Sequence, residues 1–327
     1  SGAYIVKTFI PDERVVMEAN PNYWRGKPSI DEVTWRPIPE ATARITALLT
    51  GEAQLVEGVP ADLAPLVKSK PGVKLEQVKG GGLTIYLGIK NSEPPLNDVR
   101  VRQALSLALN RDAYTQSLLH GFGTPTGTLA GPKDYGYKAI AAPKQDREKA
   151  KALLKEAGFA SGVSIDLWAM PVQRPYNPNA KRMAEMIQAD WAKIGVQTKI
   201  VTYEWGEYLK RVKGGEHQAA LMGWTTATGD PDNFFGPLFT CTSANGGSNS
   251  AKWCYKPFDK IVAEAKSITD HDKRVALYKQ AQQMMHDQMP AVMIAHSTIF
   301  EPVRKEVKGY EIDPFGKHLF WQVDINQ

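Results

Sequence analysis

Strand and helix patterns alternate in the central part of the sequence, and this alternation limits the possible folds more than any other feature. Three runs of apolar and β-branched residues have the length of strands, and between them apolar residues recur at helical spacing. The patterns predict strand, helix, strand, helix and strand in turn over residues 163–170, 179–194, 196–203, 205–212 and 218–224. Such a run is typical of a parallel, doubly wound sheet with helices on its faces, so we expect an α/β fold.

The sequence on both sides of this run predicts further elements. A hairpin is expected over residues 4–18, and a helix over 40–50 is expected to end at Gly51. Helices are also expected after the capping residues Asp98 and Asp146. Other strands and helices are predicted over residues 83–89, 258–266, 271–288 and 291–300. The three consecutive glycines at 80–82 have no phosphate-binding spacing around them, so we interpret them as a joint.

Length and charge narrow the class of protein. The 327 residues correspond to two domains or to one unusually large one. Lys and Arg number 40 against 35 Asp and Glu, and the net charge of +5 is spread along the whole chain. A nucleic-acid-binding surface needs clustered basic residues, so no nucleic-acid partner is expected. The longest apolar runs, at residues 219–224 and 291–295, are far shorter than the ~20 residues of a membrane span.

The chain has two cysteines, Cys241 and Cys254, which flank a segment of small and polar residues. They have neither the spacing of a redox motif nor enough neighbouring ligands for a metal site. Two unpaired, buried thiols in a cytosolic protein are one interpretation. A disulfide is favoured, because closing this loop removes unfolded-state entropy worth on the order of 3 kcal/mol in the chain-entropy model. A disulfide would place the protein in an oxidising compartment.

Candidate binding residues follow two of the predicted strands, since ligands bind outside the carboxyl ends of the strands in such sheets. Three prolines stiffen the loop 171–178 and hold Arg174 out of regular structure. A guanidinium placed there is suited to bidentate capture of a carboxylate or a phosphate. The second loop follows Trp224 and offers hydroxyl groups and two carboxylates, Asp230 and Asp232.

Catalytic and metal-binding signatures are missing from the sequence. It has no G-x-S-x-G motif, and its six histidines form no H-x-x-x-H pair. We therefore predict no catalytic residue, no metal site and no cofactor. A hydrolase that uses Asp230 and Asp232 as acid and base is kept as an alternative, although turn and helix-cap roles suit these residues better.

Several long motifs resemble the peptide/nickel/opine family of extracytoplasmic solute-binding proteins, which serve ABC importers. Residues 95–111 read PLNDVRVRQALSLALNR, and residues 20–28 read NPNYWRGKP. Residues 168–179 read WAMPVQRPYNPN and residues 253–258 read WCYKPF, and both resemble the dipeptide-binding members of the family. The resemblance runs from one end of the chain to the other.

The resemblance implies a fold, a location and partners. The fold is periplasmic-binding-protein-like (class II/cluster C), with two lobes that close on the ligand. Lobe II is expected at residues 80–297, with a doubly wound sheet, and residues 1–79 and 298–327 belong to lobe I. Family members begin with a signal peptide and further lobe I residues, so lobe I is expected to be incomplete and the chain to be part of a longer, exported, periplasmic protein. The expected partners are a small peptide-like ligand and an ABC permease in the inner membrane, and the protein is expected to be a monomer.

The resemblance also implies roles for individual residues. Arg174 matches the arginine that holds the peptide carboxylate in dipeptide-binding relatives. Their ammonium-binding aspartate corresponds to Ala227 in this chain, which puts free dipeptides in question as the ligand. The remaining predicted ligand-binding residues are Trp224, Thr225, Thr226 and Asp230. Haem or another large anionic molecule is the alternative ligand.

Overall fold

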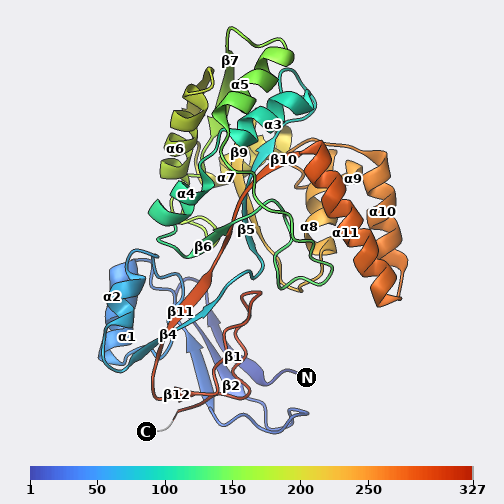
Figure 1. The fold of residues 1–327 in the computed structure, drawn as a ribbon. Coiled ribbons are helices and arrows are strands. Elements are labelled where there is room, and N and C mark those ends of the chain that lie inside the picture. The colour runs from blue at the N-terminus through green and yellow to red at the C-terminus, as the bar shows by residue number, and fades with distance from the viewer. Residues whose placement is uncertain (326–327) are drawn as a thin grey trace. The chain divides into compact units, whose positions relative to one another are not determined.

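The chain divides into two compact units, and each is described by itself below. The computed structural model describes residues 1–325. Unit 1 contains Ser1–Val78 and the segment that begins at Ile299, and unit 2 contains Lys79–Thr298. The chain therefore passes between the units twice, and unit 2 is an insertion in unit 1 (Figure 1).

Unit 1 is built mainly from antiparallel strands and two short helices. Its helices are α1 (Ala41–Thr50) and α2 (Ala64–Lys68). Its strands are β1 (Tyr4–Ile10), β2 (Arg14–Ala19), β3 (Glu32–Trp35), β4 (Val73–Val78), β11 (Ile299–Arg304), β12 (Val307–Lys308) and β13 (Asp324–Ile325). The first three form one sheet in the order β1-β2-β3, and β11 pairs with β4 and β12 with β13. The predicted hairpin is thus confirmed as β1 and β2.

Helix α1 shows how local sequence sets the boundaries of an element in unit 1. The Glu40 side chain accepts a hydrogen bond from the Ala43 amide and caps the first turn. Gly51 ends the helix with a φ of 86°, a conformation that glycine adopts without steric cost. The buried side chains of Ile45 and Leu48 then pack into the core of unit 1.

Unit 2 contains a six-stranded sheet in the order β6-β10-β5-β9-β7-β8. Its strands are β5 (Leu83–Ile89), β6 (Gly123–Pro125), β7 (Val163–Trp168), β8 (Val196–Val201), β9 (Ala219–Thr225) and β10 (Ala291–Ser297). Its helices are α3 (Val99–Leu107), α4 (Arg111–Ser117), α5 (Arg147–Glu156), α6 (Ala180–Ala192), α7 (Trp205–Gly214), α8 (Asp232–Phe239), α9 (Cys241–Ala244), α10 (Lys256–Ser267) and α11 (His271–Gln288). The predicted α/β fold is confirmed.

The sheet is mixed, which corrects the expectation of an entirely parallel sheet. Strand β7 runs parallel to β8 and β9, as the alternating pattern predicts. Strand β5 is antiparallel to both β9 and β10. The chain enters unit 2 just before β5 and leaves it just after β10, so these two neighbours must run in opposite directions. The strand predicted over 291–300 is likewise divided between β10 and β11 at the boundary between the units.

An aromatic cluster fills the core between the sheet and the helices α8, α10 and α11. Its largest fully buried members are Tyr86, Phe234, Phe235, Phe239, Phe258 and Tyr278. On α6, the fully buried Trp191 donates from Nε1 to the carbonyl of Leu105 on α3 over 3.1 Å. Among residues 1–325, no helix has the length and apolar character needed to cross a membrane.

Candidate functional site

The loops that follow β7 and β9 lie at the same edge of the sheet, because these strands are parallel neighbours. Tyr176, in the loop after β7, packs against Gly223 of β9 so closely that a Cβ at position 223 would clash with its ring. The Ser297 hydroxyl at the end of β10 donates to the Tyr176 carbonyl over 2.6 Å. The loop that carries Arg174 is thus held against two strands of the sheet.

Arg174 is half-buried and fixed through its own backbone. Its amide and carbonyl exchange hydrogen bonds with Asn177 over 3.0 and 2.9 Å, which closes a tight turn. Its guanidinium carbon lies 4.5 Å from the ring centre of Trp205, the first residue of α7. No carboxylate among residues 1–325 forms an ion pair with Arg174. A cation that is positioned by stacking and lacks a carboxylate partner can bind an anionic ligand group.

The end of β9 presents two polar atoms that lack partners within residues 1–325. Trp224 is half-buried, and its Nε1 is buried without a hydrogen-bond acceptor. Thr226 is fully buried, and its amide donates to the Gly82 carbonyl over 2.9 Å. The Thr226 hydroxyl has no hydrogen-bond partner. Thr225 and Ala227 are exposed on either side of it.

The carboxylate of Asp230 is occupied by a cation of unit 2. Its Oδ2 accepts from Nη2 of Arg274 over 2.8 Å, and its Oδ1 accepts from the Asp232 amide over 2.9 Å. The Arg274 guanidinium in turn lies over the rings of Tyr135 and Tyr278, 5.2 and 5.4 Å from their centres. Burial and then the nearby Asp230 raise the pKa of Tyr278 to about 12.

Asp232, the other candidate acid of this loop, is also paired. Its Oδ2 lies 3.4 Å from Nζ of Lys266 on α10. It occupies the first turn of α8, where a negative charge stabilises the helix. The two carboxylates considered for a hydrolase therefore both have structural partners.

The predicted disulfide is present between Cys241 and Cys254. It joins the first residue of α9 to the segment before α10. The amide of Cys241 also donates to Asp259 Oδ1 over 3.0 Å, so this corner is fixed twice.

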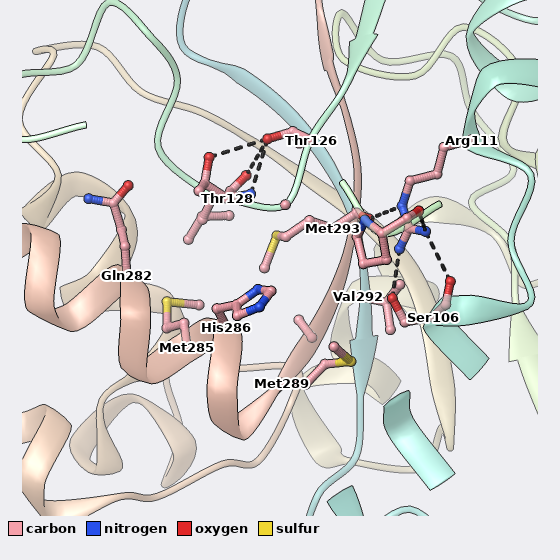
Figure 2. A pocket seen from close by; sticks show the side chains of 14 residues that line it. Ser106, Arg111, Thr126, Thr128, Gln282, Met285, His286, Met289, Val292 and Met293 are labelled. Carbon is pink, nitrogen blue, oxygen red and sulfur yellow. Dashed lines mark hydrogen bonds between the residues drawn. The ribbon is translucent and has the colours of Figure 1, made fainter. Parts of the chain in front are cut away.

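A small internal cavity of unit 2 lies away from these loops, beside β10 and α11 (Figure 2). Its volume of about 20 Å³ has room for a single water molecule. On one side the buried Arg111 donates to the carbonyls of Met293 and Ser106 over 2.8 and 2.9 Å. The cavity is too small for a solute. A larger and more open hollow of about 560 Å³ lies beside Leu107 and residues 144–149, but none of the predicted site residues lines it.

Sequence patterns alone do not assign roles to three residues that shape the site. Trp205, which stacks on Arg174, is 31 residues further along the chain, and no spacing rule connects them. Arg274 lies on α11, 44 residues after Asp230 in the loop that follows β9, and its charged surroundings in the sequence give no signal of this pair. Tyr176 has one indirect signal, since a glycine within a strand, here Gly223, often marks the close approach of another group.

Comparisons with known proteins agree with one another. The family model for bacterial extracellular solute-binding proteins, family 5 Middle, matches residues 1–246. The dipeptide-binding protein of Escherichia coli (strain K12) is 53% identical over 327 residues, which cover 99% of this chain and 61% of that protein. Heme-binding protein A of Haemophilus influenzae is 39% identical over 328 residues, covering 100% of this chain and 59% of that protein.

Solved structures show the same similarity. A dipeptide-binding protein from Pseudoalteromonas sp. SM9913, in complex with Met-Leu, superimposes with a TM-score of 0.84 at 33% identity. The match covers 99% of this chain and 64% of that one. The chain thus spans about three fifths of the length of the curated relatives that it matches.

Proposed function

The chain belongs to the bacterial extracellular solute-binding proteins of family 5, and we propose that it forms the ligand-binding part of a protein that serves an ABC importer. In this proposal the protein works in the periplasm as a monomer. It binds a small solute with a carboxylate group, most simply a peptide, and delivers it to a permease in the inner membrane. The names of the relatives support a peptide, since several of them are dipeptide-binding proteins.

The main support for this proposal is that Arg174 is held in place and has no carboxylate partner among residues 1–325. Its guanidinium is held by the turn to Asn177 and by the ring of Trp205, and no carboxylate of residues 1–325 neutralises it. The cost of ordering this side chain is therefore met before a ligand binds. A ligand carboxylate would supply the missing counter-charge and accept two parallel hydrogen bonds.

The loop after β9 completes the proposed site. Trp224 offers an aromatic surface and a free indole N–H, and Thr226 offers a free hydroxyl. Thr225 and Ala227 are exposed beside them. Asp230 is proposed to support this loop through Arg274, with direct ligand contact as the alternative role. We propose a non-catalytic function, because Asp230 and Asp232 are both engaged in ion pairs.

Calorimetry on the full-length protein tests this function. We expect Ala-Phe or a related peptide carboxylate to bind, and Arg174→Ala to weaken the affinity at least tenfold, about 1.4 kcal/mol. Arg182→Ala is the matched control, since Arg182 lies exposed on the neighbouring α6 and, within residues 1–325, its guanidinium pairs with Glu185 alone. Equal affinity of wild type and Arg174→Ala, with both folded by circular dichroism, would show that Arg174 is not the anchor.

Haem is the second candidate ligand, and two observations favour it. Ala227 leaves the exposed loop after β9 without a carboxylate at this position, and a neutral surface suits a ligand that lacks an ammonium group. One relative at 39% identity is named a heme-binding protein. Titration of the full-length protein with haem, followed through the Soret band, distinguishes the candidates: a saturable shift that Ala-Phe does not compete away would support haem.

A further inference from the structure

Three side chains that can ligate a metal meet in unit 1, apart from the proposed solute site. They are Glu57 in the loop after α1, Glu301 on β11 and His318 near the C-terminus. One ligand atom from each lies within 4.8 Å of the other two. We propose that Glu57, Glu301 and His318 form a binding site for a divalent transition-metal ion such as Zn²⁺.

The donor atoms are gathered closely enough for a rearrangement of the exposed Glu57 side chain to bring them around one ion. Nε2 of His318 contacts Oε1 of Glu57 and lies 3.8 Å from Oε1 of Glu301. Two ligands of a tetrahedral zinc ion, each about 2.1 Å from the metal, are about 3.4 Å apart. To share one ion, His318 Nε2 and Glu57 Oε1 would have to move apart from their direct contact, whereas Nε2 and Oε1 of Glu301 would have to approach by only a few tenths of an ångström.

Tyr310 orients both buried members of the cluster. Its hydroxyl contacts Oε2 of Glu301 and lies 2.9 Å from Nδ1 of His318. A metal-bound histidine usually donates its second ring N–H to an oxygen, and a ligating carboxylate is usually hydrogen-bonded as well. One tyrosine supplies both supporting contacts here, and they leave Nε2 and Oε1 pointing to the same place.

Glu301 is the most buried member of the cluster. This carboxylate is 4% exposed, and its Oε1 accepts no hydrogen bond from any of residues 1–325. A cation beside this buried carboxylate would add a counter-charge to the one that His318 supplies at 3.8 Å. The rings of Trp35 and Phe320, 4.9 and 6.1 Å from that of His318, wall the cluster with apolar surface.

The donor set indicates the class of metal. One imidazole nitrogen with two carboxylate oxygens suits zinc and its neighbours in the first transition series, whereas calcium prefers oxygen ligands alone. Three protein ligands leave a fourth position for water. The ion would join a loop, a strand and the C-terminal segment, which lie far apart in the sequence.

Titration of Zn²⁺ into the chelator-treated, full-length protein tests the site. We expect one ion to bind and to raise the melting temperature, and His318→Gln and Glu57→Gln each to weaken binding at least tenfold. Tyr310→Phe should weaken binding between 10- and 100-fold, in the range of other supporting groups. His271→Gln and Glu52→Gln are the controls, because both residues are exposed surface members of these types and should leave the affinity unchanged.

Two results would overturn the proposal. One is the absence of saturable Zn²⁺ binding, which would make the cluster a proton-bridged ion-pair network only. The other is binding that Glu57→Gln leaves unchanged, which would place the ion elsewhere. The Glu57 side chain is 51% exposed, so this variant keeps the test valid even if His318→Gln does not fold.

Discussion

We propose that Ala227 frees the site from any need for a charged ligand nitrogen. It is exposed in the loop after β9, at the position that holds the ammonium-binding aspartate in the resembled dipeptide-binding proteins. Because a neutral surface imposes less desolvation cost on an acylated nitrogen than on an ammonium, we expect N-acetyl-Ala-Phe to bind at least as well as Ala-Phe. Ala227→Asp should reverse this preference by about tenfold or more. Calorimetry with both peptides on the full-length protein measures it.

The ion pair between Arg274 and Asp230 defines the control for this experiment. Arg274 pairs with Asp230 over 2.8 Å and so keeps the nearest carboxylate of the loop occupied. If wild type already prefers the free amine, and Asp230→Asn abolishes that preference, Asp230 has left Arg274 to bind the ammonium. Such a result would contradict the neutral site that we infer from Ala227.

For single residues, the sequence predicts a position when the neighbours that define it lie in the same segment of the chain. The position of Arg174 in a loop after a strand could be predicted from the sequence, because three prolines exclude regular structure there. The support of Arg174 by Trp205 and the pairing of Asp230 with Arg274 arise only when each loop packs against a helix that is distant in the sequence. No periodicity or spacing within one segment records such contacts.

Among the elements, the disulfide corner between α9 and α10 has a measurable effect on stability. Replacing Cys241 and Cys254 together by serine should lower the free energy of unfolding by on the order of 3 kcal/mol, because the unfolded chain regains the entropy of an open loop. Urea unfolding of the full-length protein, oxidised and with this pair replaced, checks the size of the effect. Recovery of Cys241 and Cys254 in unlinked peptides after digestion without reduction would contradict the bond.

The contact between β9 and the Arg174 loop gives a second prediction at this scale. In Gly223→Ala the new methyl group would meet the ring of Tyr176 and push the loop away from the sheet. We expect at least tenfold weaker binding of Ala-Phe by calorimetry. Gly214→Ala on α7 is the control, since the nearest atom to its new methyl group lies at 3.9 Å. Unchanged affinity in Gly223→Ala would mean that the loop does not need this contact.

The pattern of elements was largely predictable, and the exceptions have a common cause. Long segments with clear periodicity, such as β5, α6, β9 and α11, agree closely with their expected ranges. Short elements such as β3, α4 and β6 have too few residues to show a period, and β6 forms only by pairing with the distant β10. Strand direction was the other failure, because β5 and β10 become antiparallel neighbours only through the passage of the chain between the units.

For the molecule as a whole, two buried histidines make stability depend on pH. Burial lowers the pKa of His217 and of His296 to about 4. The unfolded chain, with histidine pKa values near 6.5, binds more protons below that pH, so the stabilisation is complete above about pH 6.5 and is lost as the pH falls towards 4. Each histidine should remove about 2 kcal/mol between pH 7 and pH 4.5. Burial raises the pKa of Asp134 to about 6, which opposes this loss in part.

Urea unfolding of full-length protein at several pH values checks this dependence. His217→Gln isolates one contribution, because the Gln amide can replace the N–H that Nε2 of His217 donates to the Ser250 carbonyl over 2.8 Å. We expect the variant to lose less stability than wild type on acidification. An identical slope for both proteins would show that His217 is charged in the folded state or exposed at low pH.

The family resemblance is the most successful whole-molecule prediction from the sequence, and the match of the family model to residues 1–246 confirms it. Long motifs such as residues 95–111 identify a family. Composition and length alone indicated only a globular protein of one or two domains. The ligand could not be predicted in the same way, because it depends on single positions such as Ala227.

The insertion of unit 2 within unit 1 also fixes an order of events during synthesis. Strand β4 ends at Val78, and its partner β11 begins at Ile299, so roughly 220 residues leave the ribosome between them. All residues of unit 2 lie in that interval, and a contiguous segment can fold as soon as it has emerged. Unit 1 must wait with an unpaired strand edge, which is the kind of surface that chaperones cover and that aggregation exploits. Any pause of the ribosome between Val78 and Ile299 therefore lengthens the time for which β4 stays unpaired.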